Sequence, residues 1–180
     1  MPFDPTLPAT NSPLSSAEMR AQLTALKALL DAQPATAFGK VVADWTSASS
    51  SFTDVTGLAF AVAAGESWTA EIVLHAISGT TGQGLKLRVA GPGAGAVLVA
   101  MLGTGSSGST AIECEVQTAF SVASPAKTFC TGSSLIGVVR IHVVVTAASA
   151  GTVQLQASNS SGSGTVTIKA NSDLVARKTG

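Results

Sequence analysis

The chain has 180 residues, of which 46% are hydrophobic, 4% aromatic and 11% charged, and its 10 basic and 10 acidic side chains give a formal net charge of +0. This length can bury a core without metals or disulfides, and the high hydrophobic content excludes a disordered chain. Binding to nucleic acid is not expected, because phosphates require a basic surface. So little surface charge fits a protein that is covered by copies of itself or by neighbouring proteins.

The first thirteen residues are predicted to form an extended arm. Pro2, Pro5, Pro8 and Pro13 recur at close intervals, and proline fixes φ and removes a backbone donor. Phe3 and Leu7 are the apolar residues of this arm, and we expect them to dock onto another surface. The segment has no basic region followed by an apolar stretch, so a secretory signal is not predicted, and we expect the protein to be made in a cytoplasm.

A helix is predicted to begin at Ser15. With Ser15 as the N-cap, Glu18 occupies the third helical position, which is the arrangement of a capping box. Leu14 and Met19 stand where a hydrophobic staple would place them. The helix should end at Gln33, because the residue before a proline disfavours the α region.

Four large apolar residues of this helix share one stripe. Met19, Leu23, Leu26 and Leu30 recur at steps of four, three and four residues, which is heptad spacing. The stripe could pack on the protein's own sheet or on the same helix of sister chains. We favour sister chains, because the helix lies next to a proline-rich arm.

From about Lys40 onward the hydrophobic period changes to two, as in half-buried antiparallel strands. The inward positions are predicted to be Trp68, Ala70, Ile72, Leu74 and Ala76; Leu85, Leu87 and Val89; Ile112, Cys114 and Val116; Val139, Ile141, Val143 and Val145; Val153 and Leu155; and Val166 and Ile168. Glycine-rich turns separate these segments. The prediction is a mainly β protein: an antiparallel, jelly-roll-like β-sandwich over residues 38–180, preceded by an arm and one short α-helix over residues 1–37. No apolar run reaches the roughly 20 residues of a membrane-spanning helix, so no membrane association is expected.

The sequence suggests no catalytic, cofactor or metal site. His75 and His142 have no chelating partner at a short spacing. The glycines of residues 103–108 match G-x-G-x-x-G, but a β-type segment follows where a dinucleotide site needs a helix, so a flexible turn is predicted. Glu113 and Glu115 share a strand face and are interpreted as solvated. We therefore expect a protein that is not an enzyme.

The two cysteines, Cys114 and Cys130, could lie opposite each other in a hairpin. Pairing would turn Cys130 inward and Phe129 outward, although Phe129 is the better core residue. The two faces conflict unless a bulge intervenes, and cytoplasmic folding also disfavours a disulfide. We therefore favour two unpaired thiols.

The tryptophans, Trp45 and Trp68, suggest an alternative function, because sugars stack on exposed aromatic rings. This hypothesis is a module that binds host surface glycans, as in an adhesin. It requires an exposed Trp45 or Trp68. Trp68 falls on the apolar face of its strand, so burial is the prediction.

Several segments resemble the structural proteins of bacteriophage particles. The opening (residues 2–9, PFDPTLPA; 11–13, NSP; 16–20, SAEMR) and the helix end (26–32, LKALLDA) resemble the start of many virion and prophage-encoded proteins. Residues 52–60 (FTDVTGLAF) are similar to the start of a β-domain of phage tail, fibre and minor structural proteins. The later pattern of that domain is echoed at residues 84–87, 91–92, 151–158 and 166–172.

The resemblance implies a virion component without catalytic residues, often trimeric, that presents a β-sandwich outward. Its expected partners are itself and other virion proteins, and its location is the head, collar or tail. One departure is the segment Trp68-Thr69-Ala70-Glu71, where aromatic residues are common in that domain. No ligand preference is carried over. The predicted function is a small fibre, spike or capsid-decorating protein, anchored or trimerised through Phe3, Leu7, Met19, Leu23, Leu26 and Leu30.

Overall fold

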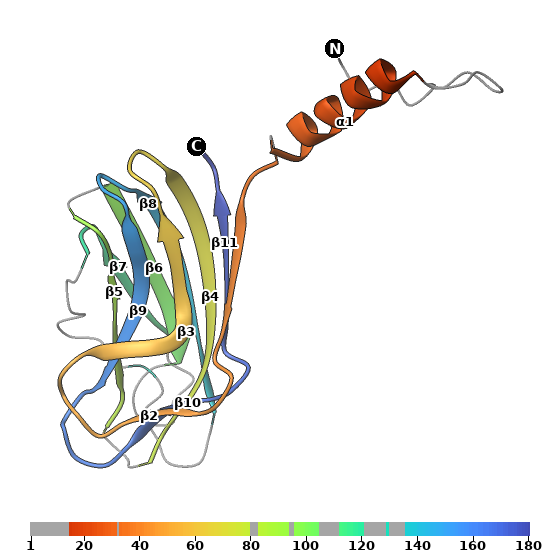
Figure 1. The fold of residues 1–180 in the computed structure, drawn as a ribbon. Coiled ribbons are helices and arrows are strands. Elements are labelled where there is room, and N and C mark those ends of the chain that lie inside the picture. The colour runs from red at the N-terminus through yellow and green to blue at the C-terminus, as the bar shows by residue number, and fades with distance from the viewer. Residues whose placement is uncertain are drawn as a thin grey trace. The chain divides into compact units, whose positions relative to one another are not determined.

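The computed structural model describes residues 15–31, 33–79, 83–93, 96–104, 112–120, 129 and 136–180. The chain falls into two compact units, residues up to Ala35 and Thr36–Gly180 (Figure 1). The first unit contains the helix α1, Ser16–Asp31. Among the described residues, no helix combines the length and the hydropathy needed to cross a bilayer.

The second unit is built from antiparallel strands. They are β1 (Thr36–Lys40), β2 (Trp45–Ser47), β3 (Thr53–Val62), β4 (Ser67–Ser78), β5 (Leu85–Ala90), β6 (Ala96–Thr104), β7 (Ile112–Gln117), β8 (Gly137–Thr146), β9 (Gly151–Asn159), β10 (Val166–Ile168) and β11 (Asp173–Lys178). The larger sheet, sheet A, has the order β1-β11-β4-β8-β6-β7, and β10 pairs with both β4 and β2. The smaller sheet, sheet B, has the order β3-β9-β5. These two sheets confirm the predicted antiparallel β-sandwich.

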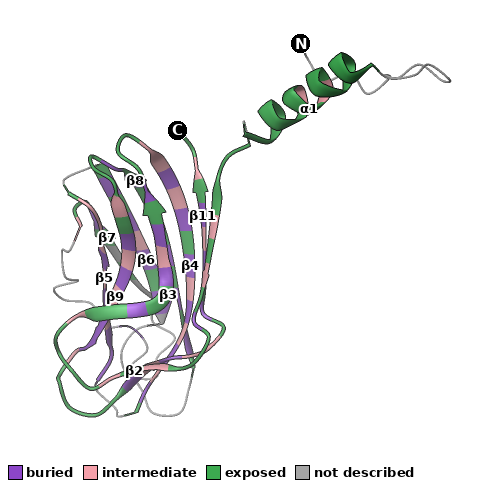
Figure 2. Ribbon diagram, viewed as in Figure 1, coloured by how far each residue is buried: buried purple, intermediate pink, exposed green. Residues whose placement is uncertain are grey.

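The core lies between the two sheets, and it explains why the strands alternate. Along β8 every second residue is buried, from Gly137 to Val145, and the same alternation runs through β4 and β5. Figure 2 shows this as buried and exposed bands along the strands. The predicted inward residues of β4, β5, β8, β9 and β10 are all buried. Hydrophobic burial along these strands is the main force that holds the sheets together.

One strand presents the opposite face from the predicted one. In β7, Cys114 and Val116 are exposed and Gln117 is buried, although Ile112, Cys114 and Val116 were predicted to face inward. The reason is the register with β6, which pairs Leu102 with Cys114 and Ala100 with Val116. Because Met101 and Val99 occupy the buried face of β6, the residues opposite Leu102 and Ala100 must face outward.

The glycine turn predicted at residues 103–108 begins later than expected. Gly103 and Thr104 are the last residues of β6, and Gly103 is buried. A Cβ on Gly103 would lie 2.8 Å from a methyl of Val139, so a strand position without a side chain is required there. Residues 105–110 lie outside the described residues.

Sheets A and B approach each other closely where β1 crosses β3. A Cβ added to Gly39 in β1 would lie 2.3 Å from the carbonyl oxygen of Gly57 in β3. A Cβ on Gly57 would lie 2.2 Å from the carbonyl oxygen of Lys40, and Gly57 has a φ of 91°. The pairing of β3 with β9 changes register between Asp54 and Ala59, which places an irregularity at this crossing. Only glycine fits both positions.

Candidate functional site

The helix start has the predicted capping box. The backbone N–H of Ser15 donates to Oε2 of Glu18 at 2.8 Å, and the N–H of Glu18 donates to Oγ of Ser15 at 3.2 Å. Hydrogen bonding to the Ser15 side chain and then to its backbone lowers the pKa of Glu18. These bonds are local, so α1 has a start signal that does not depend on the rest of the chain. The helix ends at Asp31, two residues before the predicted Gln33.

The predicted apolar stripe of α1 is exposed along its whole length. Met19, Leu23, Leu26 and Leu30 have exposed fractions of 51%, 60%, 51% and 70%, and the helix has no buried residue. Leu29, which the heptad spacing does not include, is 54% exposed and widens the stripe. Phe3, Leu7 and Leu14 lie outside the described residues. A helix of this length with a bare leucine stripe gains most of its stability only when the stripe is covered.

The His, Cys, Asp and Glu side chains of the described residues form no cluster of three or more that could bind a metal ion. His75 is half-buried on β4 and His142 is exposed on β8. Cys114 is exposed, whereas Cys130 lies outside the described residues, so the state of that pair remains a prediction. Phe129 is fully buried, as predicted.

Trp68 is buried, which confirms the prediction for it and removes it as a sugar platform. Its ring centroid lies 5.6 Å from that of Phe60, and its Nε1 donates to Oε2 of Glu66 at 3.0 Å. Glu66 also accepts from the N–H of Ala63 at 2.8 Å and from Nζ of Lys178 at 2.9 Å. These donors, the Ala63 N–H first, lower the pKa of Glu66 to about 2. The cluster ties the C-terminal strand β11 to the start of β4.

Trp45 is half-buried and lines a surface pocket. Its Nε1 donates to the carbonyl of Asp54 at 3.0 Å, which fixes the ring. The pocket has a volume of about 340 Å³, and its lining includes Lys40, Asp44, Trp45 and Thr56. Its surface is mostly apolar with a few polar groups, which is typical of sites that bind small molecules.

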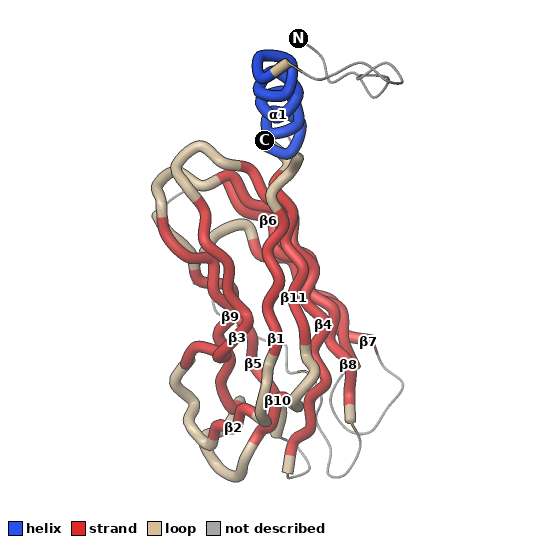
Figure 3. The backbone as a smooth tube through the Cα atoms, turned by 45° about the vertical axis from the view of Figure 1, so that its right-hand side comes forward, coloured by secondary structure: helices blue, strands red, loops and turns tan. Residues whose placement is uncertain are grey.

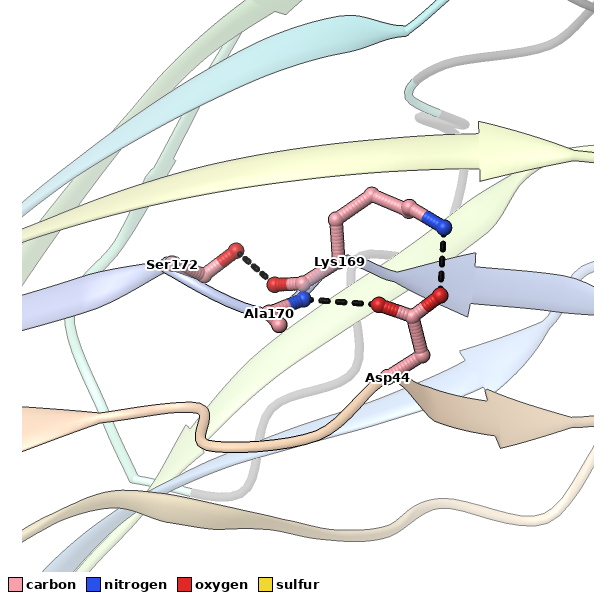
Figure 4. A network of polar contacts seen from close by, with 4 residues as sticks. All are labelled: Asp44, Lys169, Ala170 and Ser172. Carbon is pink, nitrogen blue, oxygen red and sulfur yellow. Dashed lines mark hydrogen bonds and ion pairs between the residues drawn. The ribbon is translucent and has the colours of Figure 1, made fainter.

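Asp44, at the rim of this pocket, is held in place by a polar network (Figure 4). Its Oδ1 accepts from the N–H of Ala170 at 2.8 Å, and its Oδ2 forms an ion pair with Lys169. Ser172 Oγ donates to the carbonyl of Lys169 at 2.9 Å. The Lys169 side chain and then the Ala170 N–H lower the pKa of Asp44. This carboxylate therefore anchors the segment between β1 and β2 to the turn between β10 and β11.

No protein-family model and no curated protein matches the chain. Among solved structures, the Gt strain of infectious bursal disease virus is similar with a TM-score of 0.24 and 9% identity, over 82% of this chain and 38% of that chain. The VP2 subviral particle of the same virus gives a TM-score of 0.24 and 9% identity, over 82% of this chain and 37% of that chain. The chain thus spans less than two fifths of these proteins. Similarity at this level carries no inference about function.

Proposed function

We propose that the protein is a structural subunit of a bacteriophage particle, of the small fibre, spike or capsid-decorating type. It assembles as a homo-oligomer, with a trimer as the expected state. The arm and α1 attach or trimerise the subunit, and the sandwich forms the exposed body.

The exposed stripe of α1 is the observation that carries this proposal. Four residues at heptad spacing are each exposed by half or more. Full burial of such a side chain stabilises by about 1.5–3 kcal/mol, so covering the exposed half contributes about 1 kcal/mol per residue and chain. Three chains would thus gain on the order of 12 kcal/mol from the stripe, before the entropic cost of association. The stripe is short for a coiled coil, so contacts elsewhere must add to it.

Two further features support the proposal. The net charge of +0 leaves no electrostatic repulsion between copies. The segments that resemble phage virion proteins include the start of α1 and most of β3, which is the first strand of the smaller sheet. A role in assembly explains why α1 has an apolar stripe that no residue of its own unit buries.

The experiment is the solution mass of the full chain by light scattering, with two pairs of serine substitutions in α1. The stripe pair is L23S and L26S, and the matched control pair is A21S and A28S, which lie off the stripe. We expect a helix-dependent trimer for the unsubstituted chain and for the control pair, and the loss of that trimer in the stripe pair. A protein that is monomeric and never sediments with phage particles would contradict the proposal.

A second candidate function is a glycan-binding module, and the pocket at Trp45 favours it. Because Trp68 is buried, Trp45 alone is left to carry this function. The test is saturable binding on a glycan array. Binding that is lost in W45A and kept in F38A, an exposed aromatic outside the pocket, would support it. The absence of binding by the unsubstituted protein would remove it.

A further inference from the structure

The outer face of sheet A, which points away from the core, carries a row of residues that spans its six successive strands. Neighbours in register along the row are Phe38 with Val175, Val175 with Glu71, Glu71 with His142, His142 with Ala100, and Ala100 with Val116. Figure 3 shows β1, β11 and β4 side by side, with β7 at the other edge of the sheet. We call Phe38, Val175, Glu71, His142, Ala100 and Val116 the outer row.

The ends of the outer row are apolar and exposed. Phe38 on β1 is 76% exposed and Val116 on β7 is 58% exposed. Leu98 and Leu102, on either side of the row in β6, are 45% and 47% exposed. An exposed phenylalanine and an apolar patch at the opposite edge of one sheet face mark an interaction surface.

The centre of the outer row is polar. Glu71 and His142 are both exposed, and neither side chain has a hydrogen bond or ion pair within the described part of the chain. From β1 to β7 the row reads apolar, apolar, acid, imidazole, apolar, apolar. Reversing the row exchanges only the acid and the imidazole.

We propose that a second copy of this chain packs on this face. The two-fold axis runs parallel to the strands and passes between β4 and β8. A two-fold interface must be self-complementary, and this row meets that condition. Glu71 then faces His142 of the second copy, Val175 faces its Ala100, and Phe38 approaches its Val116. Each imidazole gains a carboxylate acceptor, and each apolar end is covered.

The relief of the face fits the same arrangement. Because Ala100 is small, a hollow of about 290 Å³ lies beside it, lined among others by Leu102, Arg140 and His142. Val175 of the second copy would lie over this hollow. Sheets packed face to face are rotated by about 30°, so the correspondence is closest at Glu71 and His142, beside the axis. Toward the edges of the sheet, this rotation places Phe38 near Leu98 or Leu102 of the second copy as well as near its Val116.

The size of the face sets the expected strength. Six strands about 4.8 Å apart, with about six residues along each, give roughly 600 Å². A stable interface buries about 800 Å² per partner, so this contact is weak on its own. When contacts between α1 helices already hold the chains in one oligomer, the effective concentration of the second face is high. The sheet contact then forms more readily than between free chains. The proposal rests on the proposed self-assembly but uses a different surface.

Two charge substitutions test the pairing through mixing. In E71K the lysine faces His142 of an identical copy and cannot accept its N–H, and in H142E the glutamate faces and repels Glu71, so each variant weakens pairing with an identical copy. In a mixture, the lysine of one chain faces the glutamate introduced in the other, and the unchanged His142 faces the unchanged Glu71. Each variant alone is expected to dimerise at least tenfold more weakly, and a one-to-one mixture should recover the association. The control is K86E, a charge reversal on β5 of sheet B, which should leave it unchanged.

The measurement is sedimentation velocity of the full chain over a concentration series, with and without the L23S and L26S pair. With that pair the expected species is a dimer, which E71K or H142E alone converts to a monomer. In chains with an intact α1 stripe, E71K or H142E should abolish the association through sheet A and leave the oligomer that depends on α1. If α1 does not mediate assembly, the dimer should form both with and without L23S and L26S. This result differs from failure of the sheet A pairing, in which E71K and H142E have no effect. If both folded variants keep the association of K86E, or if their mixture stays dissociated, the inference is overturned.

Discussion

The crossing of β1 over β3 gives the sharpest test of the fold. Gly57 has a φ of 91°, and a Cβ there would lie 2.2 Å from the Lys40 carbonyl oxygen. In G57A the positive φ costs about 1–2 kcal/mol. Relieving the clash requires a backbone shift of more than 1 Å, and forced overpacking costs about 1–3 kcal/mol. The sum predicts a loss of about 2–5 kcal/mol in the free energy of unfolding.

Two other glycines separate these contributions. Gly65 has a φ of 81° and nothing within 4 Å of an added Cβ, so G65A should lose only the conformational part, about 1–2 kcal/mol. Gly39 has no positive φ, but its Cβ would lie 2.3 Å from the Gly57 carbonyl oxygen, so G39A should lose only the steric part, about 1–3 kcal/mol. The double variant G39A/G57A should lose less than the sum, because the first shift already separates the strands.

The assay is denaturant unfolding followed by tryptophan fluorescence, at one fixed protein concentration for all variants. Trp45 and Trp68 both lie in the sandwich and report its unfolding. Equal losses for G57A and G65A would refute the reasoning, since the close approach of the two backbones would then have no energetic consequence.

Three further predictions concern the core, acid stability and the helix. Leu74 is fully buried in β4, so L74A should lower the free energy of unfolding by about 2–5 kcal/mol, measured in the same assay. The pKa of Glu66 is about 2 when folded and near 4.5 otherwise, so its contribution is complete above pH 4.5 and should be lost progressively as the pH falls toward 2. E66Q should therefore flatten the acid limb of a stability-against-pH curve, and an unchanged limb would contradict the role of this cluster. S15A removes the N-cap of α1 and should cost about 1 kcal/mol of helix stability, visible as lower helicity by circular dichroism; unchanged helicity would argue against the capping box.

The parts of the fold that the sequence predicts are those with a local cause. Alternation along β4, β5 and β8 follows from burial of one face, and the start of α1 follows from Ser15 and Glu18 alone. Among the described strands, β7 pairs with β6 alone, so its orientation depends on the register with β6, which no local pattern records. Its apolar residues therefore predicted the wrong face.

The α1 stripe could be predicted from the sequence, whereas the outer row and the Trp45 pocket could not. The stripe of α1 is visible in the sequence because one helix supplies all four residues. The outer row draws one residue from each of six strands, and Phe38 and Val116 lie far apart in the sequence. Only the strand order brings them into one line, so no spacing in the sequence could have indicated it. The pocket at Trp45 was missed for the same reason, since Thr56 and Lys40 belong to different sheets.

The place of β11 in sheet A has a consequence for synthesis. Of the described strands β11 comes last in the sequence, yet it lies between β1, which comes first among them, and β4. During translation β1 has no neighbour to pair with until residues beyond 172 have left the ribosome. Contacts between such distant segments form slowly, so sheet A closes only after the remaining strands are in place. A polypeptide that stops short of Asp173 would leave β1 unpaired, and incomplete chains would be kept out of an assembly by their own failure to fold.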